Sequence, residues 1–308
     1  MARSFDHVVI VMLENASRTL VLQNAYMKSL LKKGVFLSNA IGVTHPSQPN
    51  YILSIAGDTF GFNGDNPFWV APYITSTDPN SQLPVTSIID LLEAKGLTWK
   101  SYAENIQPVD IAQPPAILFP TSDSPYPPIG PDPTSSSDPM FARRHVPCLS
   151  FPNIVTNPAR AANIVNAQSQ FESDLASRKL PNFSWYSPNL INDGHSIIVN
   201  GKVTAAMPSA QTIDNIATFL NGFLGGHPLA KFPPRTLIVV TFDESFPYSE
   251  YDIYTLLIGD MLAAGTSRDR PYNHYSLLRS IELNFGIGGL GRNDASAEPY
   301  WFVAGEAT

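Results

Sequence analysis

The stretch His7-Val8-Val9-Ile10-Val11-Met12-Leu13 decides the fold class of this 308-residue chain. An unbroken run of β-branched and other apolar residues is typical of a strand that is buried on both faces of a parallel sheet. Residues 235–242 form a second run of this kind near the other end of the chain. Because helix-like and strand-like patterns alternate around both runs, the sequence predicts an α/β fold. We expect a three-layer sandwich with a mostly parallel central sheet and helices on both faces.

The other elements follow from apolar spacing and from the Gly and Pro residues at their ends. Further strands are expected at residues 34–41, 97–103, 182–187 and 254–259, and helices at 20–33, 86–95, 158–178, 209–224 and 274–285. Residues 106–153 are dense in Pro, Ser and Asp. A loop of that length in a compact domain is generally functional or disordered. We therefore expect a single domain over residues 1–308, with a lid or wall over the site at about 106–153.

Composition narrows the possible partners. The net charge of -7 and the absence of a basic stripe argue against a nucleic-acid partner. No apolar run approaches the roughly 18 residues of a transmembrane helix, and the single cysteine, Cys148, allows no intrachain disulfide. No signal peptide precedes the first strand, so we expect a cytoplasmic protein, or a secreted or periplasmic one if an export segment has been removed. The sequence carries no signature of an oligomeric state.

A serine lies in a rigid turn, Thr44-His45-Pro46-Ser47-Gln48-Pro49-Asn50-Tyr51, after the strand expected at 34–41. Pro46 biases His45 away from the helical region, and Pro49 suits the first turn of a helix. Ser47 would then lie at or beside a helix N-cap, where free N–H groups and the helix dipole favour an anion. An ordinary capping serine and a nucleophile for an anionic ester both fit this pattern.

Two buried strands end in polar pairs, Glu14-Asn15 and Asp243-Glu244. In parallel α/β sheets, ligands bind outside the carboxyl ends of the strands, although carboxylates there are often only solvated loop residues. If both pairs converge on Ser47, their oxygen atoms would bind a hard or borderline divalent cation. Such a cation lowers the pKa of the serine and neutralises a phosphoryl oxygen.

Three histidines lie in suggestive positions. The turn Asn192-Asp193-Gly194-His195 places a carboxylate near an imidazole, His274 opens the last helix, and His45 precedes Ser47 by two residues. Each also has a plain structural explanation as a turn or capping residue. His7, His145 and His227 show no comparable pattern, and we expect no role for them.

Five motifs occur in a fixed order: residues 9–15, 44–51, 187–195, 240–244 and 273–276. Together they resemble the phosphoesterase family that contains bacterial and fungal acid phosphatases and phosphatidylcholine-type phospholipases C, within the alkaline phosphatase superfamily. The resemblance extends from about residue 8 to 285 and implies an alkaline-phosphatase-like α/β sandwich. It departs from the phospholipase C branch at Ala16-Ser17-Arg18, where that branch typically has Arg-Ser-Phe, and at Glu244, where aspartate also occurs.

The resemblance also assigns roles to residues. It implies a nucleophile at Ser47 and catalytic histidines, contacting phosphate or protonating the leaving group, at His195 and His274. It implies one divalent metal ion (Mg, Ca, Mn or Zn) held by Glu14, Asn15, Ser47, Asp243 and Glu244. Substrate contacts are expected from His45, Asn50 and Asp193.

We therefore expect a metal-dependent phosphoric ester hydrolase that acts on a small phosphoester, most simply a phosphomonoesterase with a phosphoserine intermediate. A phospholipase C or other phosphodiesterase is the first alternative. It would use the aromatic residues Phe60, Phe62, Phe68, Trp69 and Tyr73, which suit equally well a packed satellite core. The second alternative is a non-catalytic binding protein with the same fold.

Overall fold

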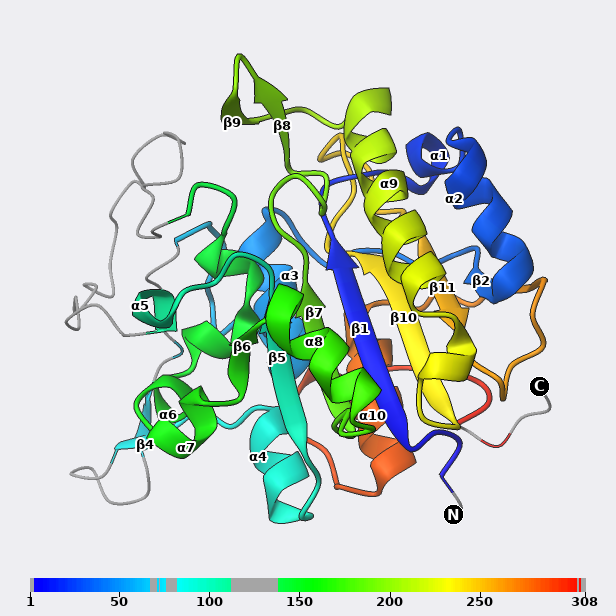
Figure 1. The fold of residues 1–308 in the computed structure, drawn as a ribbon. Coiled ribbons are helices and arrows are strands. Elements are labelled where there is room, and N and C mark those ends of the chain that lie inside the picture. The colour runs from blue at the N-terminus through cyan, green and yellow to red at the C-terminus, as the bar shows by residue number, and fades with distance from the viewer. Residues whose placement is uncertain are drawn as a thin grey trace.

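The computed structural model describes residues 3–66, 71, 73–75, 82–111, 138–303 and 305. Its centre is an eight-stranded sheet with the strand order β12-β2-β11-β10-β1-β7-β5-β6 (Figure 1). In that order the strands are Thr266–Arg268, Val35–Leu37, Thr255–Ile258, Thr236–Phe242, His7–Leu13, Phe183–Ser187, Trp99–Ala103 and Ile164–Asn166. The run that opens the sequence therefore forms the central strand β1, and its residues from Val8 to Leu13 are fully buried.

The sheet is mostly parallel, as the sequence predicts. β1 pairs in parallel with β10 on one side and with β7 on the other, and β5 continues the parallel arrangement. Among the described strands of this sheet only β11 is antiparallel to its neighbours, β10 and β2. The carboxyl ends of β1, β7 and β10 therefore meet at one edge of the sheet.

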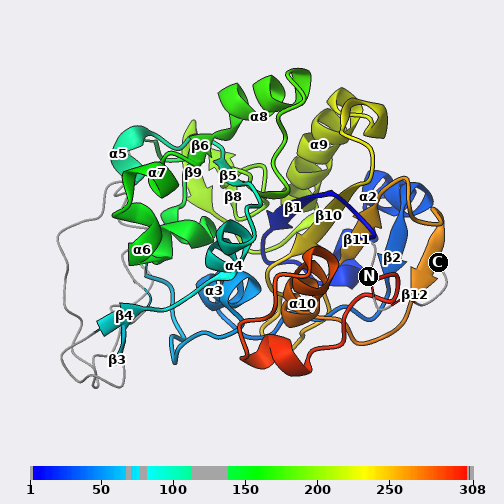
Figure 2. The ribbon, with the colours of Figure 1, turned by 90° about the horizontal axis from the view of Figure 1, so that it is seen from below.

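Helices cover both faces of the sheet (Figure 2). On one face lie α8 (Ala167–Ala176) and α9 (Ala210–Gly226), with α1 (Arg18–Val21) and α2 (Ala25–Leu30) packed against α9. On the other face lie α3 (Ser47–Ala56), α4 (Ile88–Ala94) and α10 (His274–Phe285). α9 and α10 are amphipathic and bury apolar residues such as Ile216 and Leu278 against the sheet. The result is the three-layer sandwich that the sequence predicts.

Two predicted helices were wrong in extent. The helix expected at 20–33 is divided, because the side chain of Asn24 accepts the N–H groups of Tyr26 and Met27 and starts a new helix. It ends in a short 3-10 helix, η1 (Leu31–Lys33). The helix expected at 158–178 is interrupted by β6, and Asn166 caps α8 in the same way, leaving α7 (Pro158–Ala161) as a separate turn.

The remaining elements are short. They are the hairpins β3–β4 (Tyr73–Thr75, Gln82–Pro84) and β8–β9 (Ser196–Val199, Lys202–Ala205), the helices α5 (Pro108–Ile111) and α6 (Pro152–Val155), and the 3-10 helices η2 (Arg143–His145), η3 (Pro147–Ser150), η4 (Leu229–Lys231) and η5 (Asn293–Ser296). Of the loop expected at 106–153, residues 112–137 lie outside the described residues. Its described end, which includes η2 and η3, packs against α3. Within the described ranges, no helix combines the length and apolar character needed to cross a bilayer.

Candidate active site

Ser47 is the first residue of α3, and Pro46 precedes it in an extended conformation as the N-cap residue. The side chain is almost fully buried. Its Oγ lies 2.9 Å from Oε2 of Glu14 and 3.1 Å from Oε1 of Glu244. The amide oxygen of Asn15 is 3.5 Å away. The fold therefore brings the serine and both polar strand ends together, as the sequence suggests.

Strand register produces this convergence. β1 and β10 are aligned so that Leu13 and Phe242 are partners, which makes Glu14 and Asp243 the next residues on adjacent strands. The main-chain N–H of Asp243 donates to the carbonyl of Leu13, and that of Asn15 donates to Oδ1 of Asp243. Asn15 has a φ of 56°, a left-handed conformation that asparagine tolerates better than most residues. The turn after β1 thereby directs both of its polar side chains toward Ser47.

The cluster is strongly acidic. Glu14, Asp193, Asp243 and Glu244 are all buried. Burial raises the pKa of Glu14 and of Asp193, and it raises the pKa of Asp243 to about 7. The pKa of Glu244 is raised to about 10 by burial and by the nearby charge of Asp243. Buried carboxylates that repel one another favour either protons or a cation.

The donor atoms fit a divalent cation. Oδ2 of Asp243 is buried and accepts no hydrogen bond. Around Ser47 the donors are carboxylate, amide and hydroxyl oxygens, the ligand types that hard cations prefer. Among the residues that the structure describes, no three His, Cys, Asp or Glu side chains converge by themselves as a ligand group. A cation would therefore also need the amide and hydroxyl oxygens of Asn15 and Ser47.

His145, for which the sequence indicated no role, lies inside the cluster. Its ring stacks on Tyr51 at 5.2 Å, with 5° between the ring planes. Nε2 lies 3.1 Å from Oε1 of Glu14, and Nδ1 lies 3.0 Å from Oδ2 of Asp193. Burial, together with the charge of Arg144, lowers the pKa of His145. Its position inside a long Pro-rich loop gave no hint of this, because only the packing of η2 against α3 brings it in.

Arg144 supplies positive charge next to the cluster. Its Nη2 lies 2.9 Å from Nε2 of His195, and its Nε lies 3.9 Å from Oδ2 of Asp65. Because a guanidinium can only donate, Nε2 of His195 is the acceptor. Burial and the Arg144 charge lower the pKa of His195 to about 3. Nε2 of His195 therefore faces Arg144 in this structure, and its contact with phosphate or proton donation to the leaving group stays a prediction.

His45 supports Glu244 rather than facing a phosphate. Its Nδ1 makes a short contact with Oε2 of Glu244, and its Nε2 lies 3.1 Å from the main-chain oxygen of Glu250. Burial lowers the pKa of His45. Nε2 donates to the Glu250 carbonyl, so the ring is held between that carbonyl and the carboxyl group of Glu244. His45 thus reaches the site through Glu244, and its expected contact with substrate stays a prediction.

Asn50 and Asp193 also hold the site from behind. The amide of Asn50 accepts from the N–H groups of Val43 and Thr44 and donates to the carbonyls of Thr44 and Pro46. All four hydrogen-bonding positions of this amide are thus used to shape the Ser47 turn, and the expected substrate contact of Asn50 stays a prediction. Asp193 accepts the N–H of His195 and lies beside His145, so it likewise positions other site residues.

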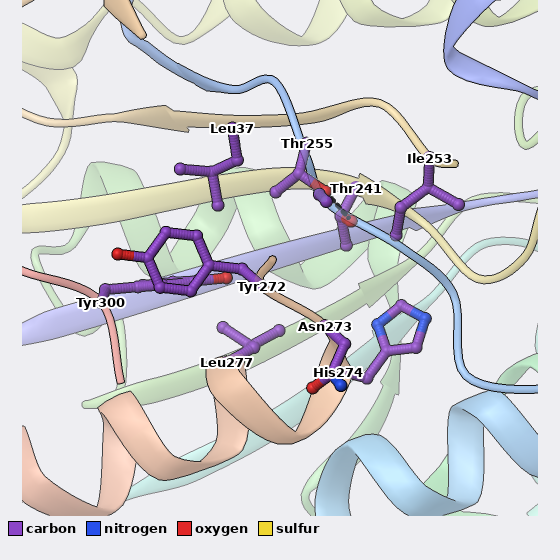
Figure 3. A pocket seen from close by; sticks show the side chains of 10 residues that line it. Leu37, Thr241, Ile253, Thr255, Tyr272, Asn273, His274, Leu277 and Tyr300 are labelled. Atoms are coloured by element: carbon purple, nitrogen blue, oxygen red, sulfur yellow. Dashed lines mark hydrogen bonds between the residues drawn. The ribbon is translucent and has the colours of Figure 1, made fainter. Parts of the chain in front are cut away.

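His274 lies behind the strand end. Its Nε2 is 2.6 Å from the main-chain oxygen of Asp243, and the ring is buried. In Figure 3 it lies beside a small internal cavity, together with Thr241, Ile253 and Asn273. Burial lowers the pKa of His274 to about 4, so the ring is neutral and Nε2 donates. This hydrogen bond fixes the main chain at Asp243, and the catalytic role expected for His274 stays a prediction.

Asp65 is a third residue that the sequence did not single out, after His145 and Arg144. Its Oδ1 accepts the main-chain N–H of Gln48, in the first turn of α3. This carboxylate therefore occupies the helix N-terminus beside Arg144, a position that suits an anion.

The chain is similar to phosphatases over almost its whole length. It is 31% identical over 308 residues to "Probable acid phosphatase" of Kluyveromyces lactis, covering 98% of this chain and 63% of that protein. It is 26% identical over 291 residues to "Phosphatidylinositol-3-phosphatase" of Mycobacterium tuberculosis, covering 94% of this chain and 79% of that protein. The chain thus spans less than two thirds of the length of the Kluyveromyces relative.

A solved structure and a family match complete the comparison. A protein in the alkaline phosphatase superfamily from Vibrio parahaemolyticus shares the fold, with a TM-score of 0.52 and 12% identity, over 96% of this chain and 71% of that one. Residues 20–288 match the Phosphoesterase family. Because this match includes Ser47, Asp193 and the Asp243-Glu244 pair, and most of the chain with them, the chain belongs to the Phosphoesterase family.

Proposed function

We propose that this chain is a phosphoric ester hydrolase of the acid-phosphatase type, a metal-dependent phosphomonoesterase with Ser47 as its nucleophile. One observation carries the proposal: Ser47 Oγ lies at a helix N-terminus within 3.1 Å of carboxylate oxygens from two different strand ends. The similarity to acid phosphatases over nearly the whole chain supports the same reaction class.

The proposed metal ligands are the residues of the acidic cluster: Glu14, Asn15, Ser47, Asp243 and Glu244. When bound, a divalent cation supplies positive charge that lowers the pKa of the serine and neutralises a phosphoryl oxygen. The oxygen donors favour Mg, Ca or Mn over Zn, which prefers nitrogen and sulfur ligands.

The side chains of the site account for the nucleophilic attack and for binding of the phosphoryl oxygens. Ser47 gives its proton to a neighbouring carboxylate oxygen, its Oγ forms a bond to phosphorus, and the ester P–O bond breaks. The departing alkoxide takes a proton from solvent, and water then cleaves the phosphoserine to phosphate and free Ser47. Arg144 and the N–H groups of the first turn of α3 bind the nonbridging oxygens. His195, His274 and Asp193 position these groups.

The phospholipase C alternative loses part of its support. Phe62 is buried in the core, and Phe60 packs under the guanidinium of Arg292 at 5.0 Å, so both act in packing. Phe68, Trp69 and the side chain of Tyr73 lie outside the described residues. A phosphomonoester carried on a lipid remains a second candidate substrate, favoured by the 26% identity to the phosphatidylinositol-3-phosphatase.

The central test is the variant Ser47→Ala assayed on p-nitrophenyl phosphate and p-nitrophenyl phosphorylcholine after loading with each candidate cation. We expect wild-type protein to prefer the monoester, and Ser47→Ala to lose at least about 1,000-fold in kcat. Ser54→Ala is the matched control, because this serine lies in the same helix and bonds only to the carbonyl of Asn50. Wild-type turnover in Ser47→Ala would end the nucleophile proposal. A wild-type protein that binds phosphate but hydrolyses neither ester would support the non-catalytic alternative.

A further inference from the structure

The segment that follows the Asp243-Glu244 pair carries two exposed aromatic rings. Tyr248 is 52% exposed and Tyr251 is 46% exposed. The ring centroid of each lies 4.8 Å from that of His45. We call His45, Tyr248 and Tyr251 the aromatic wall. Phe246 packs edge-on against Tyr248 at 5.7 Å and supports it from within the same segment.

A single carboxyl group connects the aromatic wall to the nucleophile. One oxygen of Glu244 contacts Nδ1 of His45, and its other oxygen lies 3.1 Å from Oγ of Ser47. The main-chain oxygen of Glu250 holds the opposite nitrogen of His45, so the imidazole is fixed between the site and the segment. His45 is therefore held at both ring nitrogens and positions the aromatic wall next to the carboxyl group that contacts Ser47.

Tyr248 lies beside the site, because its ring packs against His45 and His45 contacts Glu244. Partial burial raises the pKa of its hydroxyl to about 12, and the negative charges of Glu244 and Asp65 add to the effect. Asp65 is itself partly exposed and accepts from the N-terminal turn of α3. Tyr248 and Asp65 are thus partly exposed side chains near the residues that surround the buried Ser47.

Because Ser47 is buried, a phosphate ester bound there has to extend outward past such exposed side chains. The phosphoryl group must reach the buried Oγ, so the alcohol part of the ester lies outward, at the level of the half-exposed rings. A planar ring placed there would cover apolar surface of Tyr248 that is now in water and would stack against it. A short polar alcohol such as glycerol offers no comparable surface.

We propose that the aromatic wall binds the leaving group and that Tyr248 gives the enzyme a preference for phosphate monoesters of aryl or other planar alcohols. The inference rests on the proposed phosphomonoesterase function. It places Tyr248 in leaving-group binding and assigns it no part in bond making or breaking.

The test compares kcat/KM for phenyl phosphate and for glycerol phosphate in each protein. The aryl-to-alkyl ratio is kcat/KM for phenyl phosphate divided by kcat/KM for glycerol phosphate, taken within one protein. Comparing this ratio between proteins cancels the difference in intrinsic reactivity between the two esters. In Tyr248→Ala the aryl-to-alkyl ratio should fall about tenfold relative to wild type, mainly through a higher KM for phenyl phosphate. Tyr248→Phe keeps the ring and should stay within about twofold of the wild-type ratio.

The control is Leu229→Ala. Leu229 is an exposed apolar residue in η4, which leads into the amino end of β10, away from the site. The aryl-to-alkyl ratio of kcat/KM in Leu229→Ala should equal that of wild type. Circular dichroism and thermal melting of all variants check that each is folded.

Three results would overturn the inference, and they are distinguishable. If Tyr248→Ala lowers kcat/KM equally for both esters, the ring only positions His45 and Glu244. If both kcat/KM values equal those of wild type, the leaving group does not contact Tyr248. If wild-type protein hydrolyses neither ester, the proposed function fails, and this inference fails with it.

Discussion

At the scale of single residues, burial determines which carboxyl groups have a raised pKa. The cluster around Ser47 holds four buried acids, and a second pair, Glu282 and Asp294, lies buried near the carboxyl end of α10. Asp294 accepts the N–H groups of Leu290, Gly291 and Arg292, which folds the loop that follows α10. Because Glu282 and Asp294 take no part in the proposed reaction, the titration of Glu282 can be followed through the free energy of unfolding.

Glu282→Gln should stabilise the protein at alkaline pH. Burial raises the pKa of Glu282 to about 7, and the charge of Asp294 adds to this. Because the pKa is higher in the folded state, the protonated carboxyl favours folding at low pH, and that contribution is lost as pH rises toward and above about 7. We expect the variant to exceed wild type by roughly 1 kcal/mol in free energy of unfolding at pH 8.

Urea denaturation at pH 4 and pH 8 measures this difference. At pH 4 the carboxyl group of Glu282 is protonated, so it is neutral like the amide of the variant. The two proteins should then have nearly equal free energies of unfolding, and the pH 4 measurement is the control. A constant difference at both pH values would show that the substitution acts through packing or hydrogen bonds, and not through the titration of Glu282.

At the scale of elements, α3 presents its N-terminus to the site, and the turn before it is fixed by Asn50. The helix is buried along its whole length, which prevents it from shifting relative to β1 and β10. Asp65, from the loop after α3, accepts the N–H of Gln48 at the same helix end. A phosphate oxygen and this carboxylate therefore compete for one N–H group.

Asp65→Asn should tighten phosphate binding. The variant removes a negative charge next to Arg144 and the α3 N-terminus while keeping the size of the side chain. We expect the inhibition constant of inorganic phosphate to fall about three- to tenfold, together with the KM for a phosphomonoester. The matched control is Asp58→Asn in the same loop, whose carboxylate caps Phe60 instead. Weaker phosphate inhibition in Asp65→Asn would mean that Asp65 helps to build the phosphate site.

At the scale of the whole molecule, the site joins segments that are far apart in the chain. Glu14 follows β1, Ser47 begins α3, and Asp243 follows β10. A ligand that bridges all three links the centre of the sheet to a helix on one face. Local unfolding of any one segment would then be coupled to loss of the ligand.

Loading with the proposed cation should therefore stabilise the entire fold. A cation at about 100 times its dissociation constant contributes about 2.7 kcal/mol, which corresponds to a rise in Tm of about 5 °C for a chain of this size. Differential scanning calorimetry with and without a chelator measures the shift. Asp243→Asn should reduce or abolish it, because the variant removes a ligand charge whose Oδ2 is buried and unpartnered. An equal shift in this variant would place the cation elsewhere.

The long, regular elements could be predicted from the sequence because their signals are local. β1 and α10 have the bounds that apolar runs and the Asn273 cap indicate. The divided helix at 20–33 and the edge strand β6 could not, because asparagine caps and sheet pairing outweigh weak apolar periodicity there. Those outcomes depend on competition between local and tertiary contacts.

The sequence by itself determined the α/β class and the residues that meet at Ser47, because buried runs and the polar pairs that end them are patterns of adjacent residues. Only the tertiary structure brought His145, Arg144 and Asp65 next to this cluster, and only it showed that Asn50 and His274 hydrogen-bond to main-chain groups there. The physical reason is that a side chain's partners depend on packing between distant segments. Loops such as η2 acquire their positions from that packing and not from their own sequence.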